Sequence, residues 1–175
     1  LMILTADHGE EFYEHRRLGH SRTVFQELVH VPLIVRCPLW EPGVVDVPVA
    51  NLDVFPTVLS CIGLPPPDGL VGRPLGPHPP TPITVFTQTA KRNRTLAALS
   101  GDLKVIGNKR TGYALYDLAS DPDELRDLGT AAHGGLVAEL AAWEAELQTQ
   151  RREGVTVELD DEEQEALRAL GYTAD

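Results

Sequence analysis

The sequence is poor in basic residues, in cysteine and in long apolar runs. Its 175 residues include 15 Lys and Arg against 26 Asp and Glu, which gives a formal net charge of −11. Such a chain lacks the basic surface that nucleic acids or anionic membranes require, so we expect neither as a partner. No apolar run approaches the ~18–20 residues of a membrane span. Cys37 and Cys61 are too few for a disulfide framework, and we expect both to be buried small residues.

An apolar run opens the sequence and indicates an α/β fold. Residues 1–6 (LMILTA) are typical of a strand buried on both faces of a parallel sheet, and residues 31–36 (VPLIVR) are typical of a second one. Two such strands do not make a stable sheet by themselves. We therefore expect the chain to be the C-terminal part of a larger α/β domain. The alternative is a small independent fold that starts at Leu1.

Proline and glycine are dense in residues 64–82, and this density predicts a boundary between two units. We expect residues 1–80 to belong to the α/β domain, 81–152 to form a small antiparallel sheet with a helix, and 153–175 to be a tail with a short helix. Four short strand candidates separated by turn signals predict an antiparallel meander; they are 83–88, 94–100, 103–106 and 113–118.

Helices are predicted from apolar spacing and capping residues. Residues 23–30 place Val24 and Leu28 inward, and residues 51–63 have Asp53 at the N-cap and Gly63 as the stop. Asp121, Pro122 and Glu124 have the spacing of a capping box that starts a further helix. Four apolar residues at helical spacing predict one inward face, and these are Leu136, Leu140, Trp143 and Leu147. A last helix is expected from Asp161 to Leu170.

The residues with metal-binding chemistry gather near the start of the chain. Four of the six histidines lie in residues 1–30, and Asp7 and His8 come where the first strand should end. In open α/β sheets this edge is where ligands bind. A carboxylate and an imidazole make half a shell for Zn²⁺ or Mn²⁺, so the remaining ligands must come from elsewhere. The alternative is an Asp-capped turn with a locally hydrogen-bonded histidine.

Other catalytic motifs are absent from the sequence. There is no H-E-x-x-H zinc motif, because Gly9 follows His8, and no G-x-S-x-G, P-loop or G-x-G-x-x-G sequence occurs. The candidate site therefore depends on Asp7, His8 and the residues around them.

The order of several short motifs resembles the sulfatase family, within the alkaline-phosphatase superfamily. Nearly the whole chain takes part in this resemblance. The motifs are 5–11 (TADHGEE), 19–20 (GH), 31–35 (VPLIV), 52–59 (LDVFPTVL), 63–65 (GLP), 72–75 (GRPL), 115–118 (LYDL), 121–124 (DPDE) and 167–172 (LRALGY).

This resemblance implies a fold, a reaction and site residues. The fold is the C-terminal part of an alkaline-phosphatase/sulfatase-like sandwich, and the reaction is hydrolysis of a small-molecule or carbohydrate sulfate ester. Asp7 and His8 correspond to ligands of one divalent cation, Ca²⁺ by family, with Mn²⁺ or Zn²⁺ as alternatives. His20 falls where the family has a basic residue near the sulfuryl group, as general acid or hydrogen-bond donor to the substrate. His15 and His30 match no family role, and we expect them to be structural or solvated.

One departure from the family pattern is decisive. The family's nucleophile lies in a C/S-x-P-x-R motif, and residues 37–41 (CPLWE) have neither its proline nor its arginine in place. No nucleophile is therefore expected in this chain, and alone it should be inactive. Two further readings remain: a phosphonate or phosphodiester hydrolase or phosphomutase of the same superfamily, and a non-catalytic module. Substrate identity and cellular compartment stay open.

Overall fold

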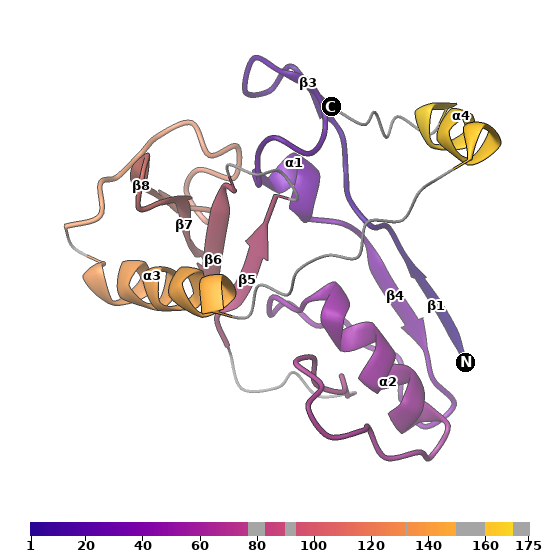
Figure 1. Ribbon diagram of the computed structural model, residues 1–175. Coiled ribbons are helices and arrows are strands. Elements are labelled where there is room, and N and C mark those ends of the chain that lie inside the picture. The colour runs from indigo at the N-terminus through magenta and orange to yellow at the C-terminus, as the bar shows by residue number, and fades with distance from the viewer. Residues whose placement is uncertain (77–82, 90–93, 132, 150–159, 170–175) are drawn as a thin grey trace.

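The computed structural model describes residues 1–76, 83–89, 94–131, 133–149 and 160–169, and Figure 1 shows their arrangement. The strands are β1 (Met2–Thr5), β2 (Glu11–Phe12), β3 (Leu18–Gly19), β4 (Leu33–Arg36), β5 (Val85–Gln88), β6 (Leu96–Ser100), β7 (Leu103–Asn108) and β8 (Gly112–Asp117). The helices are α1 (Gln26–Val29), the 3₁₀ turn η1 (Asn51–Asp53), α2 (Val54–Cys61), α3 (Gly134–Thr149) and α4 (Asp161–Ala169). No helix in these described ranges is both long and apolar enough to cross a membrane.

The C-terminal sheet is the predicted antiparallel meander, in the order β5-β6-β7-β8. Helix α3 lies across one face of it, as Figure 1 shows. Leu140 of α3 is fully buried against apolar residues of three strands, which are Leu96, Ala98, Val105 and Leu115. Leu136, Trp143 and Leu147 pack around this core, so the predicted apolar face of the helix is confirmed. The domain division at residues 80 and 152 stays a prediction.

The opposite face of the same sheet is covered by α1 and the residues before it. Val24 packs against Ala97 of β6 and Ile106 of β7, with Phe25 and Val29 beside them. Since side chains alternate along a strand, Lys104 lies on this covered face with Ile106, while Val105 faces α3. The predicted inward positions of Val24 and Leu28 are confirmed, but the helix spans four residues rather than eight.

The prediction of parallel inner strands is wrong. β1 pairs with β4 antiparallel in a two-stranded sheet, with Ile3 opposite Val35. Met2 and Leu4 are 54% and 52% exposed, so the strand is not buried on both faces in this chain. An apolar run predicts a buried strand, but it does not determine whether the neighbouring strand runs parallel or antiparallel to it. The short helix between the two strands packs on the C-terminal sheet instead of serving as their crossover.

Helix α2 is confirmed with Asp53 at its N-cap position, but the Asp53 side chain makes no capping hydrogen bond to this helix. The buried Asp53 carboxylate accepts from the backbone N–H of Ala50 (3.0 Å) and of Arg73 (2.9 Å). It therefore closes the 3₁₀ turn before the helix and holds the later loop against it. Gly63 ends the helix with a φ of +76°, the left-handed conformation that glycine adopts at low cost.

The two cysteines are bonded to each other, which corrects the expectation of two separate thiols. The disulfide joins Cys37, directly after β4, to Cys61 at the end of α2, with Cα atoms 5.9 Å apart. Cys37 is buried as expected, whereas Cys61 is half-buried. The bond fixes α2 beside the β1–β4 pair (Figure 1) and closes a loop whose cross-linking is worth about 3 kcal/mol in the chain-entropy description.

The predicted helix start at Asp121 is also wrong, because in the described residues the next helix after Asp121 begins at Gly134. The Asp121 carboxylate accepts from the backbone N–H of Leu125 and of Arg126, four and five positions on, whereas a helix cap accepts from the N–H two or three positions on. Glu124 has a φ of +50°, which cannot continue a right-handed helix. The Glu124 side chain points inward and forms a buried ion pair instead.

This buried ion pair joins Lys104 of β7 to Glu124. Lys104 Nζ lies 2.8 Å from Glu124 Oε1, and the two side chains are 1% and 0% exposed. Gln26 completes the junction, since its backbone N–H donates to Glu124 Oε2 and its side-chain oxygen accepts from Lys104. Burial lowers the pKa of Lys104 and raises that of Glu124, and the attraction between the two charges opposes both shifts.

Removing one charge of this pair should destabilise the protein strongly. We expect Lys104→Met to lower the free energy of unfolding by about 3–5 kcal/mol, because Glu124 stays buried without its counter-charge. The double variant Lys104→Met/Glu124→Gln should recover much of the loss, since glutamine still accepts from Gln26. Urea denaturation of both variants measures this, and a loss below 1 kcal/mol for the single variant would contradict the role given to the pair.

Candidate metal and catalytic site

The candidate site lies on the loop between β1 and β2. Gly9 in this loop runs directly against α1: its N–H donates to the carbonyl of Leu28 at 2.9 Å, and a Cβ at this position would overlap the carbonyl oxygen of Glu27. Glycine is therefore required for close approach of the two backbones. This contact fixes the residues on either side of Gly9 relative to α1.

Asp7 and His8 are brought together, as the sequence predicts. Asp7 Oδ2 lies 3.7 Å from His8 Nε2, and both side chains are reachable by solvent. His8 Nδ1 donates to the carbonyl of Gly9 at 2.8 Å, and this bond places the ring proton on Nδ1. The lone pair of Nε2 is thus free and faces the carboxylate, which is the tautomer that metal ligation needs.

His20 lies against this pair. Its ring stacks on that of His8, with centroids 4.2 Å apart and an interplanar angle of 27°. The short antiparallel pair of β2 and β3 carries His20 there, because Gly19 lies opposite Glu11 and brings the end of β3 back to the start of β2. The three residues chosen from the sequence therefore meet at one place.

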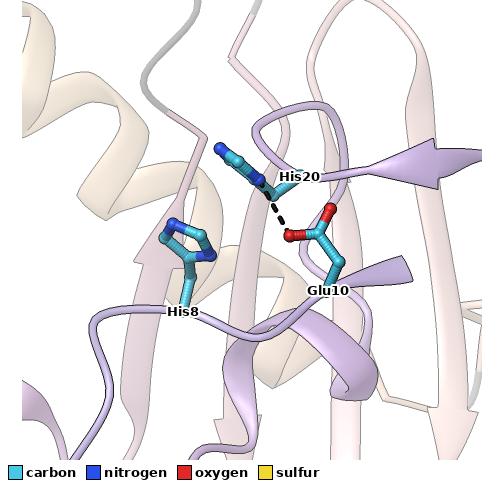
Figure 2. A group of neighbouring side chains, drawn as sticks. All are labelled: His8, Glu10 and His20. Atoms are coloured by element: carbon cyan, nitrogen blue, oxygen red, sulfur yellow. Dashed lines mark hydrogen bonds and ion pairs between the residues drawn. The ribbon is translucent and has the colours of Figure 1, made fainter. Parts of the chain in front are cut away.

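Glu10 is a member of the site that the sequence analysis did not select. Its Oε2 accepts from His20 Nδ1 at 3.1 Å, as the dashed line in Figure 2 shows. This bond places the Nδ1 proton of His20 and leaves Nε2 for another partner. The ligand atoms of His8, Glu10 and His20 all lie within 4.8 Å of one another. A polar run of Asp7, His8, Glu10 and Glu11 was the available signal, but it did not show which carboxylate points to the histidines.

This arrangement allows two ways of holding a cation. Asp7 and His8 can bind through one oxygen and one nitrogen, and His8, Glu10 and His20 offer two imidazoles and one carboxylate. The second set favours Zn²⁺ or Mn²⁺ over Ca²⁺, which prefers oxygen ligands. In either case the donor types fit a divalent metal ion, and further ligands are needed to complete the shell.

Known proteins with similar sequences are sulfatases. A family model, Sulfatase, matches residues 1–64. The uncharacterized sulfatase YidJ of Escherichia coli is 28% identical over 136 residues, which cover 73% of this chain and 27% of that protein. Arylsulfatase K of Homo sapiens is 29% identical over 147 residues, with the same coverage of 73% and 27%.

Residues 1–64 are thus similar to the sulfatase family. The predicted resemblance to this family is confirmed, and both relatives are named as sulfatases. The chain spans about a quarter of the length of these curated sulfatases.

Solved structures of sulfatases show the same fold. BT1596, a 2-O GAG sulfatase, superposes with a TM-score of 0.67 at 21% identity, over 85% of this chain and 36% of that one. BT4656, in complex with its substrate D-glucosamine-2-N,6-O-disulfate, gives 0.65 at 24% identity over 85% and 34%. The phosphonate monoester hydrolase of Agrobacterium radiobacter gives 0.63 at 25% identity over 84% and 34%. The predicted fold class, part of a sulfatase-like α/β fold with a small antiparallel sheet and helix, is confirmed.

The close approach at Gly9 can be tested directly. Gly9→Ala forces this loop away from α1, and overpacking of this kind costs about 1–3 kcal/mol of the free energy of unfolding. Gly43→Ala is the matched control, because no atom lies within 4 Å of a Cβ placed there. Urea denaturation of the two variants should show a loss for Gly9→Ala alone. Equal stability would mean that the contact with Glu27 does not fix the loop.

Proposed function

We propose that this chain contributes cation ligands and a leaving-group acid to the active site of a metal-dependent sulfate-ester hydrolase. The single observation that supports it best is the meeting of Asp7, His8 and His20, with His8 Nε2 facing Asp7 at 3.7 Å and the His20 ring stacked on His8. The nucleophile is proposed to lie outside the 175 residues, since no C/S-x-P-x-R motif occurs in them.

Each of the four residues would have its own role in the reaction. Asp7 and His8 would hold the cation, with Glu10 or His20 as further ligands, and a bound divalent ion would offset charge on the sulfuryl oxygens. If His20 instead remains free of the metal, its Nε2 is available to give a proton to the departing oxygen. Glu10 would then act as a positioning residue, because its bond to Nδ1 keeps Nε2 directed away from itself.

The substrate class is proposed from the similar proteins. A sulfated carbohydrate is the proposed substrate, supported by the glucosamine disulfate bound in a structure of similar fold. Ca²⁺ is the cation implied by the family, while the two imidazoles at this site favour Mn²⁺ or Zn²⁺. The likeness to a phosphonate monoester hydrolase supports a second candidate, hydrolysis of phosphonate or phosphate esters on the same scaffold. A non-catalytic module is the reading that remains if neither ester is cleaved.

Loss of one metal ligand should abolish turnover. In the complete gene product, we expect Asp7→Asn to lower kcat/KM for 4-nitrophenyl sulfate by about a thousandfold, corresponding to several kcal/mol of transition-state stabilisation. Asp46→Asn is the control, since Asp46 is exposed on the loop between β4 and η1 and belongs to neither group of candidate ligands. The 175-residue chain alone should show no turnover. Normal activity of Asp7→Asn would remove Asp7 from the metal shell, and cleavage of 4-nitrophenyl phenylphosphonate in place of the sulfate would favour the second candidate.

The role of His20 predicts a dependence on the leaving group. His20→Gln should lower kcat by about a hundredfold or more for a sugar sulfate, whose alkoxide needs a proton to depart. The loss should be far smaller for 4-nitrophenyl sulfate, because nitrophenolate leaves without protonation. An equal loss for both substrates would instead place His20 among the metal or sulfate ligands.

A further inference from the structure

A second group of ligating side chains lies on the other side of the β2 strand. Glu11 of β2, His15 of the turn that follows and Glu27 of α1 present ligand atoms that all lie within 4.8 Å of one another. Glu10 and Glu11 are neighbours in an extended segment, so their side chains point to opposite sides. Glu10 meets His20, whereas Glu11 meets this group. The two clusters are therefore separate.

We propose that Glu11, His15 and Glu27 bind a divalent transition-metal ion, with Zn²⁺ best suited to the donor set. Two carboxylates and one imidazole match the oxygen and nitrogen ligands of zinc sites, and a water completes four-coordination in sites that have three protein ligands. This site is independent of the cation proposed at Asp7 and His8.

Burial of Glu11 is the observation that points to a ligand. The residue is 2% exposed, and its Oε1 is buried with no hydrogen-bond partner among the described residues. Its Oε2 accepts only a 3.3 Å bond from the Thr23 hydroxyl. A carboxylate removed from water without compensating partners costs several kcal/mol, so a cation at this position would satisfy a group that the described protein atoms leave unsatisfied.

The local charge supports a divalent ion. Among the described residues, Glu27 forms one ion pair, with His15, and Glu11 forms none. The nearby Lys104 is already paired with Glu124. Two carboxylates thus share one imidazole, which is neutral when it acts as a metal ligand. A charge of +2 balances them.

The ligands are held in place before any ion binds. The His15 ring stacks on Phe25 with centroids 3.6 Å apart and an interplanar angle of 3°, which fixes its orientation. His15 Nδ1 lies 2.7 Å from Glu27 Oε1. Two ligands of a tetrahedral zinc ion, each at about 2.0 Å from it, are roughly 3.3 Å apart, so a small opening of this pair would admit the metal. Of the three ligands, His15 also lines a surface depression of about 330 Å³, together with Thr23, Phe25, Arg16 and Arg17.

Zinc binding by the 175-residue chain tests this site. The background variant Asp7→Asn/His8→Gln/His20→Gln removes three of the four side chains of the first cluster, and we expect calorimetry to show one Zn²⁺ per chain in it. Adding Glu11→Gln or Glu27→Gln should weaken Zn²⁺ binding at least about tenfold. Glu10→Gln is the matched control: it removes the neighbouring carboxylate and should leave this affinity unchanged.

Two outcomes would overturn the site. They are failure of the background variant to bind Zn²⁺, and equal affinity in the Glu11→Gln and Glu10→Gln variants; either would make His15 and Glu27 a plain ion pair. Should Glu11→Gln not fold, the zinc K-edge absorption spectrum of the background variant decides. One imidazole with oxygen ligands would support the assignment, and two imidazoles or a sulfur ligand would refute it.

Discussion

The buried ion pair of Lys104 and Glu124 is the interaction on which the remaining structure depends. It joins the middle of the C-terminal sheet to the loop after β8, and both charges bind Gln26 at the start of α1. Helix α1 in turn accepts the Gly9 N–H and holds His15 through Glu27. A lysine on one strand of the C-terminal sheet therefore supports the loop that carries Asp7 and His8, more than ninety positions earlier in the chain.

Through this ion pair, the C-terminal sheet and the N-terminal segment of the chain together position the candidate site. The C-terminal sheet buries α3 on one face and the segment of α1 on the other, so it is both a small core and a platform. The β1–β4 pair is tied to α2 by the Cys37–Cys61 disulfide. The loop from Asp7 to Glu10 runs between these two rigid parts, and the Gly9 contact fixes its position against one of them.

Local patterns in the sequence predicted the elements well and their partners poorly. The meander, α2 and the face of α3 follow from period and turn residues, which act within a few positions. The direction of β1, the pairing of the cysteines and the partner of Glu124 depend on residues far away, which no window of sequence contains. At Asp121 the local spacing is that of a capping box, but Glu124 pairs with the buried Lys104 and its backbone has a positive φ, which is not helical. The candidate site shows the same division. The sequence predicts Asp7, His8 and His20, which lie close together in the structure, but not Glu10, because its contact with His20 depends on how β2 and β3 pair.

In the proposed site, the carboxylate of Asp7 and the imidazole of His8 bind a single divalent cation beside His20. The most direct measurement is a crystal structure of the chain grown with Mn²⁺, with an anomalous difference map calculated at the manganese edge. The account predicts a peak roughly 2.0–2.6 Å from both Asp7 Oδ2 and His8 Nε2, the span of distances that divalent cations keep from such ligands. A map with manganese bound elsewhere and none between these two atoms would contradict it.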